Sequence, residues 1–191
     1  ENDIFNKLLS AKKVIVDIDR HEIDKIATKI DIKFNLDAAK FLDALLTKVS
    51  HINLDTKVWL RRCQSWKKKY PVVLAEFSQE KKYVNPYVLV DRLSELLTKD
   101  DLIVPGSSGS CSEITMQAFK VKKGQRIFND PGLGSMGFGL PASIGACLAS
   151  GGRRTISIIG DGGLQHNIQE LQTLKRLDLP VKIFVLNNNG Y

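Results

Sequence analysis

The sequence predicts an α/β protein in which a parallel sheet is flanked by helices. Short apolar segments rich in β-branched residues alternate with helical patterns along the chain, which is typical of parallel sheets covered on both faces. Glycine-rich loops follow several of these segments, as they do where a ligand binds beyond the carboxyl ends of parallel strands.

Residues 1–50 are expected to form the C-terminal part of a Rossmann-like α/β domain whose start is missing. Val14–Asp19 is a β-branched run that ends in carboxylates, which predicts a buried strand reaching the edge of a sheet. A helix is expected over His21–Lys29. From Asp37 onward, apolar residues recur at helical spacing, which predicts an amphipathic helix.

Residues 51–85 carry no strand pattern and are expected to form a helical linker. Basic residues concentrate between Arg61 and Lys69, with Trp59 and Trp66 among them, in a chain of formal net charge +7. This composition is compatible with a nucleic-acid surface. A solvated helix face with tryptophans docked on neighbouring domains is favoured, because charge runs are usually exposed. We therefore expect no nucleic-acid partner.

Residues 86–191 are expected to form a ligand-binding domain that is truncated at its C-terminus. Asn85-Pro86 predicts a helix start, because asparagine caps helices and proline suits the first turn. Four strands are expected after this helix, at Leu102–Val104, Arg126–Phe128, Thr155–Ile159 and Lys182–Leu186. The residues that suggest chemistry follow the ends of these strands.

The turn after the third of these strands, Gly160-Asp161-Gly162-Gly163, combines glycines with a carboxylate. Glycines let the backbone approach a bulky anion, and the N-terminus of the next helix offers N–H groups. A carboxylate would repel a bare phosphate, so Asp161 indicates a hard cation such as Mg²⁺ between carboxylate and phosphates. The next strand ends in Asn187-Asn188-Asn189, whose amides would meet Asp161 across the sheet edge. Each pattern alone also occurs in ordinary turns.

Together, Gly160-Asp161-Gly162 and the later Asn188-Asn189-Gly190 resemble the signature of thiamine-diphosphate-dependent enzymes. The resemblance implies that Mg²⁺ on the diphosphate is held by Asp161, the Asn188 side chain and the Gly190 carbonyl. Within that family, the stretch Asn167–Leu171 is most similar to acetolactate synthases. The expected fold is accordingly the thiamine-diphosphate-binding fold.

The glycine-rich segment Asp130–Pro141 is a second match to the same family. The resemblance implies that the Gly134 carbonyl accepts from the 4′-amino group of the cofactor. It also implies that the Met136 N–H meets the pyrimidine and that the Met136 side chain wedges the cofactor into a bent form. The other residues expected to contact the cofactor are Gly106, Ser107, Ser108, Ser135, Gly160, Gly162, Gly163 and Tyr191.

A third loop, Pro105–Glu113, offers small residues and hydroxyls to the diphosphate or the substrate. Ser112 is expected to cap the next helix, and Cys111 is expected to be a buried thiol without a catalytic base. Acetolactate synthases carry a Gln-His-Gln-rich segment at this place, so the resemblance leaves the substrate open.

In the N-terminal segment, Asp17 matches a strand-end carboxylate that can touch the ribose of bound FAD or ADP in the family. Many relatives keep this fold without the nucleotide, so FAD is left open. The resemblance implies no catalytic residue in this chain, because the activating glutamate lies on a pyrimidine-binding domain of a second subunit. A homodimer or tetramer is therefore expected, and the chain alone is expected to be inactive.

The expected reaction is decarboxylation of a 2-oxo acid with carboligation to a second carbonyl, as in acetolactate synthases. The alternatives are a 2-oxo acid decarboxylase, a carboligase acting on a nucleotide-sugar ketone, or a non-catalytic cofactor-binding module. The polar residues 1–3, the three widely spaced cysteines and the lack of a long apolar run lead us to expect a cytoplasmic protein without a membrane partner.

Overall fold

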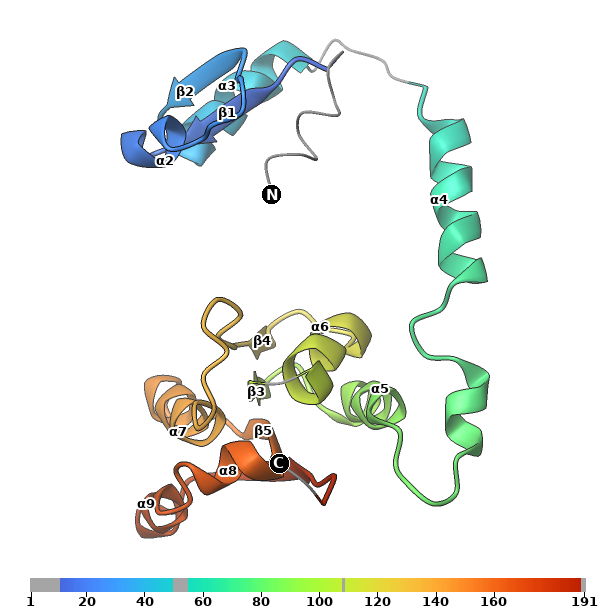
Figure 1. Cartoon of the computed structure of the whole chain (residues 1–191), viewed down its shortest axis with the longest axis vertical. Coiled ribbons are helices and arrows are strands. Elements are labelled where there is room, and N and C mark those ends of the chain that lie inside the picture. The colour runs from blue at the N-terminus through green and yellow to red at the C-terminus, as the bar shows by residue number, and fades with distance from the viewer. Residues whose placement is uncertain (1–10, 50–54, 108, 190–191) are drawn as a thin grey trace. The chain divides into compact units, whose positions relative to one another are not determined.

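The computed structural model describes residues 11–49, 55–107 and 109–189, which form two compact units divided between Gln64 and Ser65. The division falls within the segment 51–85, which was expected as a linker. The domain boundaries drawn from the sequence remain predictions. Figure 1 shows the course of the chain through both units.

The N-terminal unit has a two-stranded parallel sheet of β1 (Val14–Asp17) and β2 (Ile32–Asn35), connected through α2 (Arg20–Asp24). The helix predicted over 21–29 is shorter than expected, since α2 ends at Asp24 and Lys25 is its C-cap residue. Asp19 caps α2 by accepting from the His21 N–H at 2.8 Å. The predicted amphipathic helix is confirmed as α3 (Ala38–Val49), and it begins after Asp37, which accepts from the Ala39 N–H at 2.8 Å.

The predicted linker contains α4 (Lys57–Lys69) and a 3₁₀ turn, η1 (Ala75–Gln79). Trp59 and Trp66 on α4 are 58% and 42% exposed. The basic residues of this helix are also exposed, which agrees with the expected solvated face, whereas the docking of the tryptophans on neighbouring domains remains a prediction.

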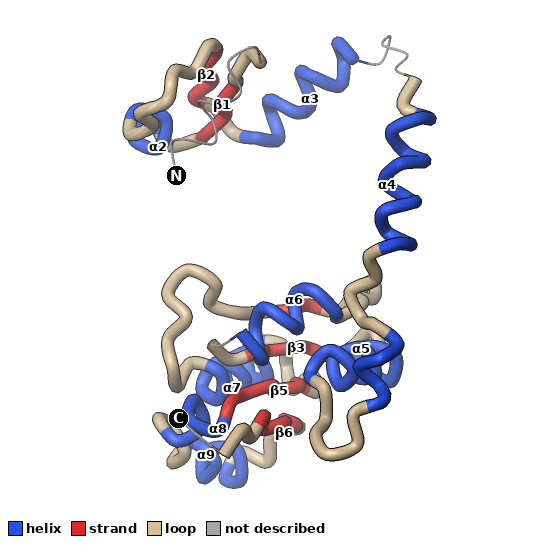
Figure 2. The backbone as a smooth tube through the Cα atoms, turned by 45° about the vertical axis from the view of Figure 1, so that its right-hand side comes forward, coloured by secondary structure: helices blue, strands red, loops and turns tan. Residues whose placement is uncertain are grey.

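The C-terminal unit contains a four-stranded parallel sheet in the order β4-β3-β5-β6. Its strands are β3 (Leu102–Pro105), β4 (Arg126–Ile127), β5 (Thr155–Gly160) and β6 (Val181–Leu186), and they confirm the four predicted strands to within one residue at either end. Figure 2 shows β3, β5 and β6 side by side. The remaining elements are α5 (Pro86–Leu96), the π-helical turn η2 (Gly109–Glu113), α6 (Ile114–Ala118), α7 (Gly139–Ala149), α8 (Asp161–Gln165) and α9 (Glu170–Arg176).

Helices cover both faces of this sheet, with α5 and α6 on one side and α7 and α9 on the other (Figure 1). Alternation along β5 explains the two layers, because successive side chains of a strand point to opposite faces. Ile156 and Ile158 belong to the core formed with Val90 of α5. Ser157 instead meets Ser143 of α7, and the two buried hydroxyls are hydrogen-bonded at 2.7 Å. The predicted start of α5 is confirmed, since Asn85 Oδ1 accepts from the Tyr87 N–H at 2.9 Å.

Candidate functional site

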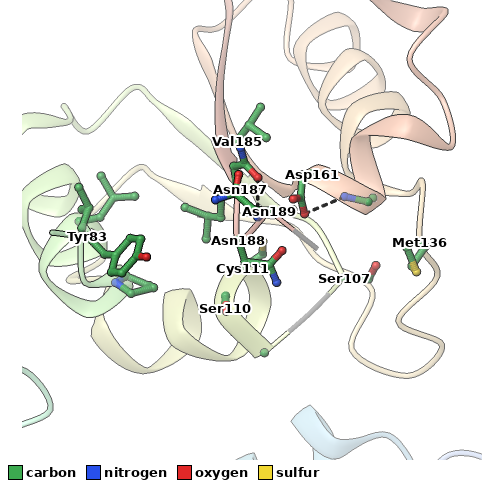
Figure 3. Close-up of a pocket in the computed structure, with 18 of the residues that line it drawn as sticks. Tyr83, Ser107, Ser110, Cys111, Met136, Asp161, Val185, Asn187, Asn188 and Asn189 are labelled. Carbon is green, nitrogen blue, oxygen red and sulfur yellow. Dashed lines mark hydrogen bonds between the residues drawn. The ribbon is translucent and has the colours of Figure 1, made fainter. Parts of the chain in front are cut away.

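The site is built where β5 and β6 end. Gly160 lies opposite Leu186 in the parallel register of these strands, so the residues that follow them leave the sheet side by side. Figure 3 shows Asp161, Asn187 and Asn189 among the residues that line a pocket at this edge. The parallel register and the shared pocket place Asp161 and the amide run at the same edge of the sheet, while their contact through a metal remains a prediction.

The carboxylate of Asp161 is oriented by its own turn. Its Oδ1 accepts a hydrogen bond from the Gly162 N–H at 2.9 Å, and Asp161 is also the first residue of α8. A Cβ added at Gly160 would meet nothing within 4 Å. Open space therefore lies on the side of Gly160 that a side chain would occupy.

A pocket of about 1000 Å³ opens at this edge of the sheet. This volume is at the upper end of the usual range for small-molecule sites. All of its walls come from the C-terminal unit, and they are formed by Lys82, Tyr83, Val84, Pro86, Leu89, Ser107, Gly109, Ser110, Cys111, Met136, Gly160, Asp161, Gly162, Gly163, Val185, Leu186, Asn187, Asn188 and Asn189.

Most of the predicted site residues that the structure describes lie on these walls. The pocket brings together Ser107, Met136, Gly160, Asp161, Gly162, Gly163 and Asn188, which come from four separate segments of the chain. Three further predicted residues, Ser108, Gly190 and Tyr191, lie outside the described residues. Their expected roles, including the Gly190 carbonyl as a metal ligand, therefore remain predictions.

Four predicted residues are not on the pocket wall. Gly106 is buried, and its N–H donates to the Ile158 carbonyl at 2.7 Å. Gly134 and Ser135 lie in the exposed part of the loop before α7. Asp17 belongs to the N-terminal unit, and its Oδ1 accepts from the Asp19 N–H at 2.8 Å. The ligand contacts expected of these four residues remain predictions.

Met136 stands in the pocket wall and not in the core, as its glycine neighbours suggested. Its side chain is 43% exposed, and Figure 3 shows it on a loop separate from the strand ends that carry Asp161 and Asn188. The loop turns twice through left-handed backbone, with φ of +60° at Gly134 and +88° at Gly137. The Gly134 N–H donates to the Asp130 carbonyl at 3.1 Å. The two turns and this hydrogen bond shape the loop that places the Met136 side chain on the pocket wall.

One wall was not expected from the sequence. Tyr83, Val84, Pro86 and Leu89 line the pocket, although they belong to the end of the predicted linker and the start of α5. Lys82 adds a positive charge there, with its Nζ 5.0 Å from the centre of the Tyr83 ring. No local signal marks these residues, because only the packing of α5 brings them to the strand ends.

The expected cap at Ser112 is wrong. The chain enters α6 through η2, a continuous π-helical turn, so Ser112 lies inside helical backbone and not at its start. Its Oγ accepts instead from the Asn129 side chain at 3.0 Å. Cys111 is fully buried and is not in a disulfide bond, which agrees with the expected buried thiol.

The donor atoms of the pocket fit a hard cation that bridges the protein and an anion. Within residues 11–49, 55–107 and 109–189, no cluster of three or more His, Cys, Asp or Glu side chains could hold a metal by itself. Asp161 would thus share a cation with amide, backbone or ligand oxygens. Mg²⁺ is typically bound in this way, through one or two carboxylates together with phosphate oxygens.

Residues 107–191 match the family model described as "Thiamine pyrophosphate enzyme, C-terminal TPP binding domain". The α/β fold with its parallel sheet is consistent with such a domain, and the matched residues contain the Met136 loop, Asp161 and Asn188.

Within this class, the chain is similar to acetolactate synthases. It is 34% identical to "Acetolactate synthase 3, chloroplastic" from Brassica napus over 93% of the chain and 27% of the relative. It is 35% identical to "Acetolactate synthase 2, chloroplastic" from Nicotiana tabacum over 93% and 27%, and 34% identical to "Acetolactate synthase large subunit" from Cyanidium caldarium over 94% and 30%. The binding domain of this chain is homologous to that of acetolactate synthases, and the chain spans less than a third of the length of these relatives.

Proposed function

We propose that this chain supplies the diphosphate- and Mg²⁺-binding half of the active site in a thiamine-diphosphate-dependent enzyme of the acetolactate synthase type. The reaction would be decarboxylation of a 2-oxo acid with carboligation to a second carbonyl. The observation that carries the proposal is the meeting of Asp161 and Asn188 in one pocket, beyond the paired ends of β5 and β6. The acetolactate synthase relatives favour this function over the decarboxylase, nucleotide-sugar and non-catalytic alternatives.

In the proposed complex, the residues of this chain bind and orient the cofactor. Asp161 and Asn188 would hold Mg²⁺, the glycines after β5 would let the diphosphate approach the backbone, and Met136 would contact the ring end. When bound, thiamine diphosphate supplies the electron sink for cleaving the carbon–carbon bond beside a carbonyl. FAD forms no part of the proposal, since neither the matched domain nor the names of the relatives refer to it.

A second subunit would contribute the pyrimidine-binding domain and its activating glutamate, so the proposed enzyme is a homo-oligomer. Its location in the cytoplasm remains a prediction, and the Brassica napus and Nicotiana tabacum relatives are named chloroplastic. No helix in the described ranges of the chain is long and apolar enough to cross a membrane.

Replacement of Asp161 tests the proposal. Asp161→Asn keeps the shape of the side chain but removes its charge. We expect it to weaken Mg²⁺-dependent binding of thiamine diphosphate by about 100-fold, or about 2.7 kcal/mol. Isothermal titration calorimetry of the 191-residue chain, with and without Mg²⁺, measures this affinity.

Asp100→Asn is the matched control, because Asp100 is an exposed carboxylate outside the pocket. The control should bind as the unchanged chain does. Equal affinity in Asp161→Asn and the unchanged chain, or binding that does not depend on Mg²⁺, would rule out the proposed role of Asp161.

A further inference from the structure

Asn167 connects the two sides of the pocket. This residue lies in the turn between α8 and α9, and its Nδ2 donates to the Gly137 carbonyl at 2.8 Å. Gly137 is the neighbour of Met136 on the loop before α7. The hydrogen bond therefore joins the loop that carries Met136 to the segment that begins with Asp161.

Both ends of the Asn167 amide are engaged. Gln169 Nε2 donates to Asn167 Oδ1 at 3.2 Å, which directs the Nδ2 group toward Gly137. A carbonyl oxygen can only accept, so the Gly137 side of the contact requires a donor. The backbone of the turn is held as well, since the Asn167 N–H donates to the Leu164 carbonyl of α8 at 3.3 Å.

The loop and the turn also meet in close contact at Gly137. A Cβ at this position would lie 2.7 Å from Asn167 Nδ2 and 3.0 Å from the Cβ of His166. Gly137 is buried, with a φ of +88° that side chains rarely adopt. Only glycine allows the loop to approach the turn closely enough for the hydrogen bond.

We propose that Asn167 is a positioning residue that sets the place of Met136 relative to Asp161, and thereby the fit of the ring end of the bound cofactor. This inference rests on the proposed function, because it assigns one side of the pocket to the ring and the other to the diphosphate. Asn167 is absent from the pocket wall, so its effect on binding would be transmitted through Gly137 and Met136.

Binding of two different ligands distinguishes a positioning role of Asn167 from a general contribution of Asn167 to the stability of the fold. Inorganic pyrophosphate with Mg²⁺ probes the Asp161 side alone, whereas thiamine diphosphate with Mg²⁺ probes both sides. The variant is Asn167→Asp, in which a carboxylate of the same size faces the Gly137 carbonyl and cannot donate to it. The control is Gln172→Glu, which makes the same chemical change at an exposed site on α9.

In calorimetry with the whole chain, we expect Asn167→Asp to bind thiamine diphosphate about tenfold more weakly. This is the effect expected from losing one hydrogen bond between two uncharged groups. Pyrophosphate affinity should be unchanged in the variant, and both affinities should be unchanged in Gln172→Glu. An equal loss for both ligands, or no loss for thiamine diphosphate, would overturn the positioning role. Failure of the unchanged chain to bind either ligand would overturn the proposed function itself.

Proteolysis gives a readout that needs no cofactor. Leu133 at the tip of the same loop is 85% exposed and is a chymotrypsin target. If Asn167 anchors the loop, Asn167→Asp should be cut at Leu133 faster than either the unchanged chain or Gln172→Glu, at equal melting temperature. The same rate of cutting in all three proteins would show that the hydrogen bond does not hold the loop.

Discussion

Asp101 and Arg154 form the ion pair with the most buried carboxylate among the pairs described. The Asp101 side chain is 2% exposed and that of Arg154 is 45% exposed. Arg154 donates from Nε and Nη2 to the two carboxylate oxygens, at 2.6 and 2.7 Å. Its hydrogen bonds hold the pKa of Asp101 below the usual 3.8, against the opposing effect of burial. The Thr98 N–H adds a further hydrogen bond at 2.6 Å.

This arrangement predicts a pH-dependent stability. Because the pKa of Asp101 is lower in the folded chain than in the unfolded one, its contribution is complete above the unfolded value and is lost as the pH falls through the folded value. Asp101→Asn should lower the free energy of unfolding by about 2 kcal/mol at neutral pH. The difference should shrink below about pH 4.

Urea unfolding of both proteins across this pH range measures the effect, with Asp100→Asn as an exposed neighbouring control. The opposite result is that the two proteins differ in their free energy of unfolding by the same amount at acidic and at neutral pH. That result would contradict the assignment of the effect to the ionised pair.

At the scale of the elements, the start of α7 packs unusually close to the sheet. A Cβ at Gly139 would lie 3.1 Å from the Gly106 Cα and 3.1 Å from Ile159 Cγ1. Gly139→Ala should therefore push α7 away from β3 and β5, at a cost of about 1–3 kcal/mol.

Gly145→Ala on the same helix is the matched control, because its Cβ would meet nothing within 4 Å. Relief of glycine's backbone entropy should instead stabilise the chain by up to about 1 kcal/mol. Thermal unfolding should thus shift in opposite directions for the two variants. If both variants shift the unfolding temperature in the same direction, close packing at the start of α7 is not the reason for glycine at position 139.

β3, β5 and β6 could be predicted because each is a largely apolar run that ends in a recognisable turn, whereas β4 is shorter and carries the charged Arg126. β2 (Ile32–Asn35) was missed, since Lys33 and Asn35 interrupt its apolar residues and all four of its residues are exposed. The strand ends at Asp161 and Asn188 followed from local pattern and parallel pairing. The Tyr83 wall and the Asn167–Gly137 hydrogen bond depend on contacts between residues distant in sequence, which no local pattern reveals.

At the scale of the whole molecule, the site and its supporting core belong to one unit. Every residue of the pocket lies between Lys82 and Asn189, and the main apolar core, which includes Val90, Ile103 and Ile158, lies in the same range. In the described part of the N-terminal unit, Ile23 is the one buried large apolar side chain. We therefore expect the larger unit to fold without the smaller one.

A chain of residues 71–191, which begins after α4, should consequently keep the Mg²⁺-dependent pyrophosphate affinity of the 191-residue chain within about twofold, a difference of about 0.4 kcal/mol. Calorimetry of the two proteins side by side measures this, with Asp161→Asn in the shorter chain as the control that should lose binding. If the shorter chain unfolds cooperatively but binds pyrophosphate far more weakly, residues before Pro71 take part in the site. If it binds as the longer chain does, the diphosphate side of the site is complete within the unit that carries Asp161 and Asn188, and any effect of residues 1–70 falls on the ring or the substrate.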